Sequence, residues 1–315
     1  MIKTTKMDIF KGRIRKLAFY FRHPQYAQKY AKRFSSSFSQ ADLECCVKNM
    51  YEFRTGKKLD LDNVNTFNEK LNWLKCFYHD ERMTECADKV SAPSYFRKHT
   101  GLDDSFIVKN LGVFDSPEEI DFDALPNQFV LKSNWGSGTQ IIVKNKKKVN
   151  YEQIKEKMKS WNSIETNHYY HGFEYGYKNI VPKIVCEEYI DFEYKMEFFC
   201  FDGTPHYFWT VYNDKTDEVC ANFYDAKTLE KLDVRQGYPN SSEKLNLPTD
   251  YDDMLLVASN LSKGFPFVRI DFFKTKTGFK FSEMTFYHWC GFMPFDPVKY
   301  DIEFGNKLIL PKKRV

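Results

Sequence analysis

One arginine and two acidic residues near the C-terminus have the types and spacing of a site that binds a cation and a phosphate. They lie in FVRIDFFKTKTGFKFSEMTFY, two runs of apolar and β-branched residues around a central turn, a pattern that predicts a β-hairpin. If the hairpin is centred near Thr277, Asp271 lies opposite Glu283. Arg269 then lies opposite Thr285, and period-2 alternation places all four side chains on one face.

The two carboxylates of this hairpin would repel each other. Directly opposite side chains have Cβ atoms about 5 Å apart, so pairing Asp271 with Glu283 is unfavourable unless a cation bridges them. Mg²⁺ suits the position, because one or two carboxylates usually hold it while phosphate and water complete its coordination. Arg269 could then hold a phosphate or stabilise transition-state charge. The hairpin alone is equally consistent with a surface salt bridge from Arg269 to either acid.

The pattern of a second segment, FVLKSNWGSGTQIIV, predicts a strand, a loop of small residues and another strand. The backbone amides of Gly136, Ser137, Gly138 and Thr139 can donate to phosphate, while Lys132 supplies a positive charge. Many such turns are simply tight hairpins. The loop therefore indicates phosphate binding only in combination with the acidic hairpin.

The elements that must position these segments follow from hydrophobic periodicity. Residues 40–100 are mostly helical in pattern, and Thr66 with Glu69 predicts a capping box at the start of a helix. After about residue 105, short β-rich runs alternate with turns and with helical stretches at 151–161 and 250–263. We predict an α/β or α+β fold whose C-terminal two thirds are rich in sheet.

Composition limits the class of protein. The chain has 315 residues, 42% hydrophobic and 17% aromatic, enough for one large core or two ordinary ones at roughly 150 residues per domain. Residues 1–33 hold ten Lys or Arg and one acid, which leaves 37 basic against 42 acidic residues for the rest. The basic charge is confined to the N-terminus, so we predict no nucleic-acid partner.

Eight cysteines without a CxxC pair indicate small buried side chains in a reducing compartment. No stretch approaches the ~18 apolar residues of a membrane span. We predict a cytoplasmic protein.

Residues 9–22 predict a basic amphipathic helix that ends at His23-Pro24. Its apolar face consists of Phe10, Ile14, Leu17, Ala18 and Phe21. Two interpretations remain open: peripheral contact with an anionic membrane at the inner face, or an ordinary terminal helix that packs on its own domain.

Taken together and in order, several segments resemble the TupA-like ATP-grasp family of polysaccharide-modifying proteins, from about residue 55 to the C-terminus. They are TFNEKLNWLK (66–75), DKVSAPSYFRKHTG (88–101), LGVFDSPEEIDFDALPNQFVLKSNWGSG (111–138), CEEYI (186–190), FFCFDGTPHYF (198–208), NFYD (222–225), GYPN (237–240), FPFVRIDFF and SEMTFY.

The resemblance implies an ATP-grasp fold of two α+β subdomains that clasp ATP, preceded by a helical region. Along this chain the implied regions are an N-terminal helical region (1–86) and an ATP-grasp domain (87–315). The latter would divide into a lid subdomain at about 104–186 and a catalytic subdomain at about 187–315.

The resemblance also implies roles for individual residues. Lys89 and Lys132 would approach the nucleotide, with Lys132 on its phosphates, and Lys195 would reach ribose or phosphate. The remaining nucleotide contacts would come from the hinge strand and the lid loop: Glu187, Glu188, Tyr189 and Ile190, and Ser137, Gly138 and Thr139. Asp271, Glu283 and Thr285 would hold Mg²⁺. Arg269 would steady an acyl phosphate, as the corresponding arginine does in D-alanine:D-alanine ligase.

Three departures from the family pattern concern the same region. Thr285 stands where ATP-grasp enzymes more often have Asn. Lys195 is offset from the position of a basic residue in some members, and Glu197 lies on the same face. Bulky His288 and Trp289 follow the metal motif and would reshape the acceptor pocket.

The implied activity is that of an ATP-dependent carboxylate–amine ligase that forms an amide through an acyl phosphate. Its partners would be ATP, an amino acid or small amine, and a glycan or a nucleotide- or lipid-linked sugar that carries a carboxylate. The product would be an amide of a uronic acid in a capsular or O-antigen polysaccharide. Alternatives are a catalytically inactive ATP-grasp glycan-binding protein, a sugar or lipid kinase, and a glycosyltransferase.

Overall fold

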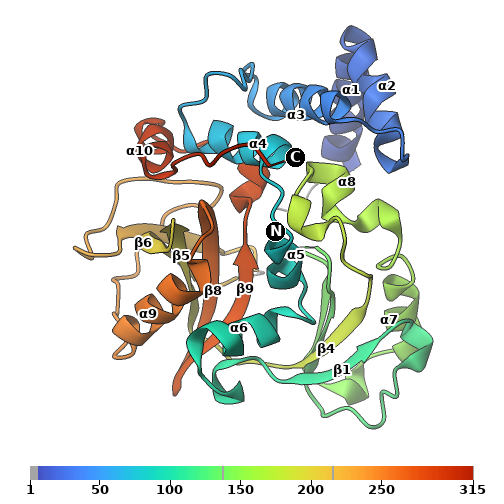
Figure 1. Cartoon of the computed structure of the whole chain (residues 1–315). Coiled ribbons are helices and arrows are strands. Elements are labelled where there is room, and N and C mark those ends of the chain that lie inside the picture. Colours follow the sequence, from blue (N-terminus) through green and yellow to red (C-terminus); the bar gives the residue numbers. More distant parts are fainter. Residues whose placement is uncertain (1–5, 137, 215, 315) are drawn as a thin grey trace. The chain divides into compact units, whose positions relative to one another are not determined.

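Residues 6–100 are mostly helical, as the sequence predicts for residues 40–100, and all the strands lie from residue 110 onwards in the described part of the chain (Figure 1). The computed structural model describes residues 6–136, 138–214 and 216–314, without the side chains of residues 6–11 and 13. The α-helices of this part are α1 (Lys6–Arg22), α2 (Pro24–Ala31), α3 (Gln40–Thr55), α4 (Phe67–Phe77), α5 (Arg82–Ala87), α6 (Ala92–Thr100), α7 (Tyr151–Met158), α8 (His168–Gly172), α9 (Tyr251–Ser262) and α10 (Lys299–Lys307).

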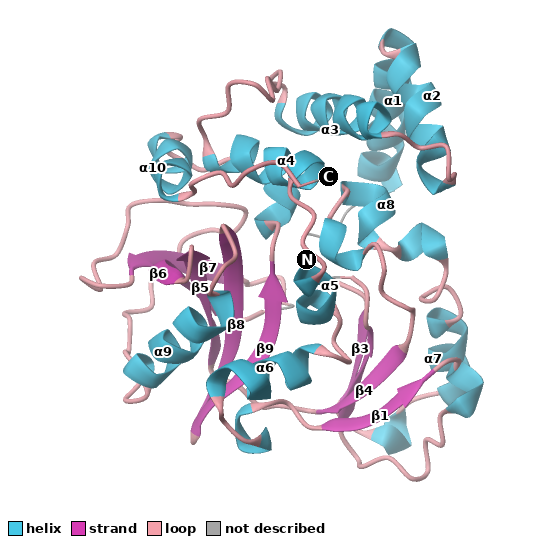
Figure 2. Cartoon of the chain, in the orientation of Figure 1, coloured by secondary structure: helices cyan, strands magenta, loops and turns pink. Residues whose placement is uncertain are grey.

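The strands form two sheets, drawn in magenta in Figure 2. The strands are β1 (Asn110–Phe114), β2 (Phe129–Ser133), β3 (Gln140–Val143), β4 (Ile184–Glu188), β5 (Tyr194–Phe201), β6 (Thr204–Tyr212), β7 (Cys220–Asp225), β8 (Phe267–Thr275) and β9 (Gly278–Thr285). The smaller sheet has the order β1-β4-β2-β3, and the larger has the order β7-β6-β5-β8-β9. The pairs β1–β4, β2–β3, β2–β4, β5–β8 and β8–β9 are antiparallel. The predicted mixed fold with a sheet-rich C-terminal part is confirmed.

The chain divides into two compact units. One comprises Met1–His79, Trp209–Glu243 and Tyr287–Val315, and the other comprises Asp80–Phe208 and Lys244–Phe286. Every residue that the sequence assigns to nucleotide or metal binding belongs to the second unit. The predicted boundaries at residues 86/87 and 186/187 stay a prediction.

The smaller sheet buries one face and leaves the other polar. Along β2, Phe129 and Leu131 are fully buried, whereas Val130 and Lys132 keep some exposure to solvent. Phe129 and Leu131 pack in a core that also contains Met158 of α7. Because successive side chains of a strand point to opposite faces, this core holds Lys132 on the other face.

The β8–β9 hairpin has the predicted register at the acidic residues: Asp271 pairs with Glu283, and Arg269 with Thr285. Nearer the turn the pairing shifts by one residue, because a bulge leaves Ser282 without a partner position. The turn alone would therefore place Asp271 opposite Ser282. The bulge moves Glu283 to that position.

The sequence carries a signal for this bulge that the symmetric prediction does not use. Apolar residues of β9 occupy odd positions at Phe279 and Phe281, then even positions at Met284 and, just past the strand, Phe286. A regular strand cannot change the parity of its buried face. The change marks the extra residue.

Helix α9 covers the apolar face of the larger sheet. The ring of Phe198 lies 5.8 Å from that of Tyr251, and the Cys200 thiol contacts the Ala258 carbonyl at 3.9 Å. Glu197 and Phe199 alternate with these residues and therefore face the opposite side, as do Arg269 and Asp271 on β8. Burial of one face against α9 thus fixes which side chains form the candidate site.

Helix α4 begins at the predicted capping box. The Thr66 hydroxyl accepts a hydrogen bond from the Glu69 backbone N–H at 3.3 Å, and the Glu69 carboxylate accepts one from the Thr66 N–H at 2.9 Å. Two backbone donors that the helix cannot satisfy itself are satisfied in this way.

We expect Thr66→Ala to lower the free energy of unfolding by about 1 kcal/mol, because it removes the side-chain acceptor at the N-cap. Thr66→Ser keeps the hydroxyl and should stay within a few tenths of a kcal/mol of the parent protein. Urea denaturation followed by tryptophan fluorescence, to which Trp73 of α4 contributes, measures both. Equal losses in the two variants would contradict a capping role.

Candidate nucleotide site

Three acidic residues lie in one row across adjacent strands of the larger sheet. Glu197 of β5 pairs with Asp271 of β8, and Asp271 pairs with Glu283 of β9. The Asp271–Glu283 pairing is as predicted. From the sequence, Glu197 is placed only on the same face of its strand as Lys195. Its position beside Asp271 is not predicted, because pairing of β5 with β8 joins segments more than seventy residues apart.

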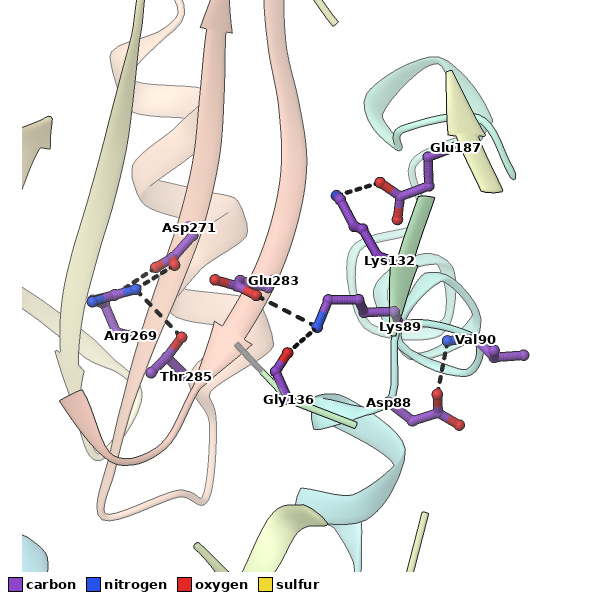
Figure 3. A network of polar contacts seen from close by, with 10 residues as sticks. All are labelled: Asp88, Lys89, Val90, Lys132, Gly136, Glu187, Arg269, Asp271, Glu283 and Thr285. Carbon is purple, nitrogen blue, oxygen red and sulfur yellow. Dashed lines mark hydrogen bonds and ion pairs between the residues drawn. The ribbon is translucent and has the colours of Figure 1, made fainter. Parts of the chain in front are cut away.

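Arg269 is a cation beside this row, and Figure 3 shows it next to Asp271 and Thr285. Its Nε and Nη2 donate to the two carboxylate oxygens of Asp271 at 2.7 and 2.6 Å. Its Nη1 lies 3.2 Å from Glu197 Oε2, and its Nη2 lies 3.4 Å from the Thr285 hydroxyl. The Arg269–Asp271 salt bridge considered in the sequence analysis is therefore present. It is not a surface pair, since the side chain of Asp271 is 1% exposed.

Burial changes the proton affinity of this pair. Loss of water raises the pKa of the Asp271 carboxyl well above its usual range, although Arg269 opposes the effect. The pKa of Arg269 is raised by Asp271 and Glu197, which outweigh its own burial. The guanidinium therefore stays charged. The carboxyl groups of the acidic row need positive charge nearby in order to stay ionised.

Lys89 brings a second cation to the row. It lies in the turn between α5 and α6, and its Nζ donates to the Gly136 carbonyl at 2.8 Å and lies 4.0 Å from Glu283 Oε2. Burial lowers the pKa of Lys89, and Lys132 lowers it further, while Glu283 and Glu187 oppose the change. Figure 3 shows Lys89 between Glu283 and the glycine loop.

The buried side chain of Asn134 fixes the end of β2 relative to the turn that carries Lys89. Its amide nitrogen donates to Asp88 Oδ1 at 2.9 Å, and its oxygen accepts from the Lys183 N–H at 2.7 Å. Asp88 Oδ1 also accepts from the Val90 N–H at 2.9 Å. Nothing in the sequence predicts this role for Asn134, because an Asn beside a glycine loop gives no signal of such long-range bonds.

Lys132 forms an ion pair with Glu187 on the polar face of the smaller sheet. Lys132 of β2 is the Cα partner of Val185 on β4, so Glu187 is its diagonal neighbour on the same face. Both side chains are at least 85% buried. A predicted phosphate ligand and a predicted hinge residue are thus in direct contact.

The glycine loop joins β2 to β3 as predicted. Gly138 has a φ of +77°, a conformation that favours glycine, and a Cβ there would meet no other atom within 4 Å. The Thr139 carbonyl accepts from the Ser133 N–H at 3.2 Å. Ser137, a predicted phosphate ligand, lies outside the described residues.

The other predicted nucleotide residues lie along β4, β5 and the loop between them. Glu188 Oε1 accepts from the Lys109 N–H at 3.0 Å and lies 3.6 Å from Lys280 Nζ. Ile190 is half-buried just after β4. Tyr189 and Lys195 each form a cation–π contact. Lys144 Nζ lies 5.7 Å from the centre of the Tyr189 ring, and Lys195 Nζ lies 5.5 Å from the centre of the Phe273 ring.

The donors on the hairpin fit Mg²⁺ in chemical type. Asp271, Glu283 and Thr285 offer hard oxygen atoms from two carboxylates and a hydroxyl, a set that a magnesium ion completes with phosphate and water. No group of three or more His, Cys, Asp and Glu residues within the described ranges is arranged to hold a metal by itself. Both Asp271 oxygens accept hydrogen bonds from Arg269, so a metal there would compete with the guanidinium.

The predicted acceptor-pocket residues belong to the first unit. His288 is fully buried, and its Nε2 lies 2.9 Å from Gln236 Oε1. The Trp209 ring packs edge-on against the imidazole, with ring centres 5.2 Å apart. A role of His288 and Trp289 in shaping an acceptor pocket stays a prediction.

A family model described as TupA-like ATPgrasp matches residues 69–309, which is most of the chain. The chain belongs to the TupA-like ATP-grasp family. This confirms the resemblance and the ATP-grasp fold, with α1, α2 and α3 preceding the matched region. No curated protein matches the sequence.

Three solved structures illustrate the range of similar proteins. L-amino acid ligase from Bacillus licheniformis is 18% identical, with 65% of this chain and 44% of that chain covered and a TM-score of 0.42. D-alanine–D-alanine ligase from Bacillus anthracis, complexed with ATP, is 13% identical, with 69% and 55% covered and a TM-score of 0.37. PsnB, complexed with a phosphomimetic precursor variant, Mg and ADP, is 12% identical, with 75% and 65% covered and a TM-score of 0.36. The chain spans less than two thirds of each of these proteins.

The charge of Glu283 leads to a prediction about stability. Burial disfavours ionisation of this carboxyl, but Lys89, Lys195 and Arg269 outweigh burial and lower its pKa from 4.5 to about 2. A carboxyl whose pKa falls on folding contributes stability that is complete above its unfolded pKa and is lost as the pH drops through its folded pKa. Glu283→Gln should therefore be less stable than the parent protein at pH 7, with a deficit that shrinks below pH 4.5.

Urea titrations across this pH range, with a chelator and without nucleotide, measure the deficit. Exposed Glu193 precedes β5 on the same sheet, and Glu193→Gln serves as the matched control with no deficit. A deficit of Glu283→Gln that is the same at every pH would contradict the charge assignment.

Proposed function

We propose that the protein is an ATP-dependent carboxylate–amine ligase that joins an amino acid or another small amine to a uronic acid of a bacterial capsular or O-antigen polysaccharide. One observation carries the proposal most directly. Arg269, Asp271, Glu283 and Thr285 lie together on one face of the β8–β9 hairpin, with Lys89 in contact with Glu283. Cations and metal-binding oxygen atoms placed together in this way can position the phosphates of ATP and neutralise the charge that develops during phosphoryl transfer to a carboxylate.

The reaction explains why ATP is needed. A carboxylate is a poor electrophile, because its charge repels nucleophiles and oxide is a poor leaving group. Transfer of the ATP γ-phosphoryl group to a carboxylate oxygen releases ADP and forms an acyl phosphate. The amine then attacks the carbonyl carbon, the C–O bond to phosphate breaks, and the amine loses a proton. The products are an amide, ADP and phosphate.

The chain's own residues would act through charge and position. Lys89 and Lys132 would approach the nucleotide, with Lys132 on its phosphates. The Lys132 ammonium would then contact phosphate in place of Glu187. Arg269 would offset the charge that accumulates on the transferred phosphoryl group. Asp271, Glu283 and Thr285 would hold Mg²⁺, which when bound neutralises phosphate charge.

The remaining cofactor contacts are proposed for the hinge strand and the lid loop. Glu187, Glu188, Tyr189 and Ile190 would bind the adenine, and Lys195 would reach the ribose or a phosphate. The amides of Ser137, Gly138 and Thr139 would close over the phosphates and exclude water from the acyl phosphate.

The partner that carries the carboxylate is proposed to be a glycan or a nucleotide- or lipid-linked sugar, and the reaction is proposed to take place in the cytoplasm. The resemblance to polysaccharide-modifying proteins supports this substrate class. A glycan-binding protein without activity, a sugar or lipid kinase, and a glycosyltransferase are the competing classes, and each gives a distinct result in the assay below.

We expect ADP release from MgATP to require both a uronic-acid glycan and an amine, in a panel of such glycans crossed with amino acids. Glu283→Gln should reduce the rate by about a hundredfold or more, because it removes a proposed metal ligand and a neutraliser of Lys89. Glu193→Gln should retain the parent rate. Mass spectrometry of the glycan should show an amide in the productive combination.

Three outcomes would contradict the ligase. ADP release with the glycan alone, together with a phosphorylated glycan, would indicate a kinase. ATP binding without turnover on any pair, unchanged in Glu283→Gln, would indicate a non-catalytic protein. Preference for a nucleotide sugar over ATP would indicate a glycosyltransferase.

A further inference from the structure

Helix α1 exposes a row of large apolar side chains. Ile14, Leu17 and Phe21 are 51%, 68% and 90% exposed. Their spacing of three and then four residues places them on one face of the helix. These residues belong to the apolar face that the sequence predicts for residues 9–22.

The opposite face of α1 packs against its own unit. Phe19 stacks on His23 with ring centres 4.1 Å apart and contacts Phe53 of α3 at 5.1 Å. Arg15 Nη2 donates to the Phe53 carbonyl at 2.9 Å, and the rings of Tyr20 and Tyr26 lie 5.3 Å apart. The helix is therefore fixed by its less apolar side, and Ile14, Leu17 and Phe21 of the predicted apolar face do not pack on the domain.

The segment that carries this exposed row is rich in positive charge. Arg22 is exposed at the end of the helix. Lys16, six residues earlier, is also exposed, and its Nζ lies 5.5 and 5.8 Å from the ring centres of Tyr20 and Tyr30. Burial of part of the Lys16 side chain, and then the charges of Arg33 and Arg54, lower the pKa of Lys16. Residues 1–33 contain ten Lys or Arg and a single acid. This end of the chain thus has a large excess of positive charge beside exposed apolar groups.

We infer that α1 lies on an anionic lipid bilayer, with Ile14, Leu17 and Phe21 inserted at the level of the headgroups and the basic side chains on lipid phosphates. Exposed aromatic and aliphatic residues next to lysines and arginines are the two features that bind a helix to such a surface. No described helix is long and apolar enough to cross a membrane.

Charge favours a bilayer over a second copy of the chain. Two copies that met through this face would bring two basic segments together, which costs energy, whereas an anionic surface neutralises each segment. The inference stands independently of the proposed ligase activity, because α1 precedes the matched family region at residues 69–309.

Vesicle co-flotation of the full chain tests the inference. We expect binding to mixed phosphatidylcholine–phosphatidylglycerol vesicles, little binding to phosphatidylcholine alone, and release as salt rises, since salt screens headgroup charge. The double variant Leu17→Glu/Phe21→Glu should lose binding by about tenfold or more, because it removes two inserted apolar groups. Arg22→Gln should weaken binding less.

Leu256→Glu is the matched control, since Leu256 is 61% exposed on α9 in the other unit and should leave vesicle binding unchanged. Light scattering measures the molecular mass of each variant, and circular dichroism with urea denaturation checks that each remains folded. The inference would be overturned if the parent protein ignored anionic vesicles or bound both vesicle types equally. It would also be overturned if the double variant kept full vesicle binding, or if it changed only the molecular mass and thereby showed self-association.

Discussion

The site depends on one constraint, which is the repulsion between carboxylates that lie close together in a low-dielectric environment. Glu197, Asp271 and Glu283 occupy one cross-strand row, and Asp271 is almost completely buried. Such a row is unfavourable unless cations compensate it. Arg269 binds two of the acids and Lys89 contacts the third, so the polar face of the sheet is a compensated array of charges. A nucleotide and its metal ion would bind by adding their own charges to this array.

The ion pairs and hydrogen bonds around this array connect segments that lie far apart in the chain. Lys89 contacts both Glu283 and the glycine loop, and Asn134 ties the turn beside Lys89 to the end of β2. The pKa of Lys89 responds to Lys132 and Glu187 as well as to Glu283. The smaller sheet and the β8–β9 hairpin therefore share one electrostatic environment within the second unit. A phosphate that bound there would meet both lysines and Arg269 while the acids held the metal.

The sequence predicts the local geometry of the site well, because a hairpin is a short-range structure. Asp271 opposite Glu283 follows from alternation and a turn, although the assumed symmetry gives the right pair only because Ser282 forms a bulge. Partners on distant strands could not be predicted in this way. The contact of Glu197 with Arg269 depends on β5 joining β8, and that of Lys132 with Glu187 on β4 joining β2. Buried Asn134 has no pattern that would reveal its bonds. Membership of the family is predicted from several segments taken together, and the family model confirms it.

Isothermal titration of the purified chain with ATP, in the presence of Mg²⁺ or of a chelator, tests the central claim that this array of charges is a MgATP site. The account predicts that ATP binds with Mg²⁺, that the chelator weakens binding at least about tenfold, and that Asp271→Asn removes most of the difference. ATP that failed to bind, or that bound equally with Mg²⁺ and chelator in both proteins, would contradict it.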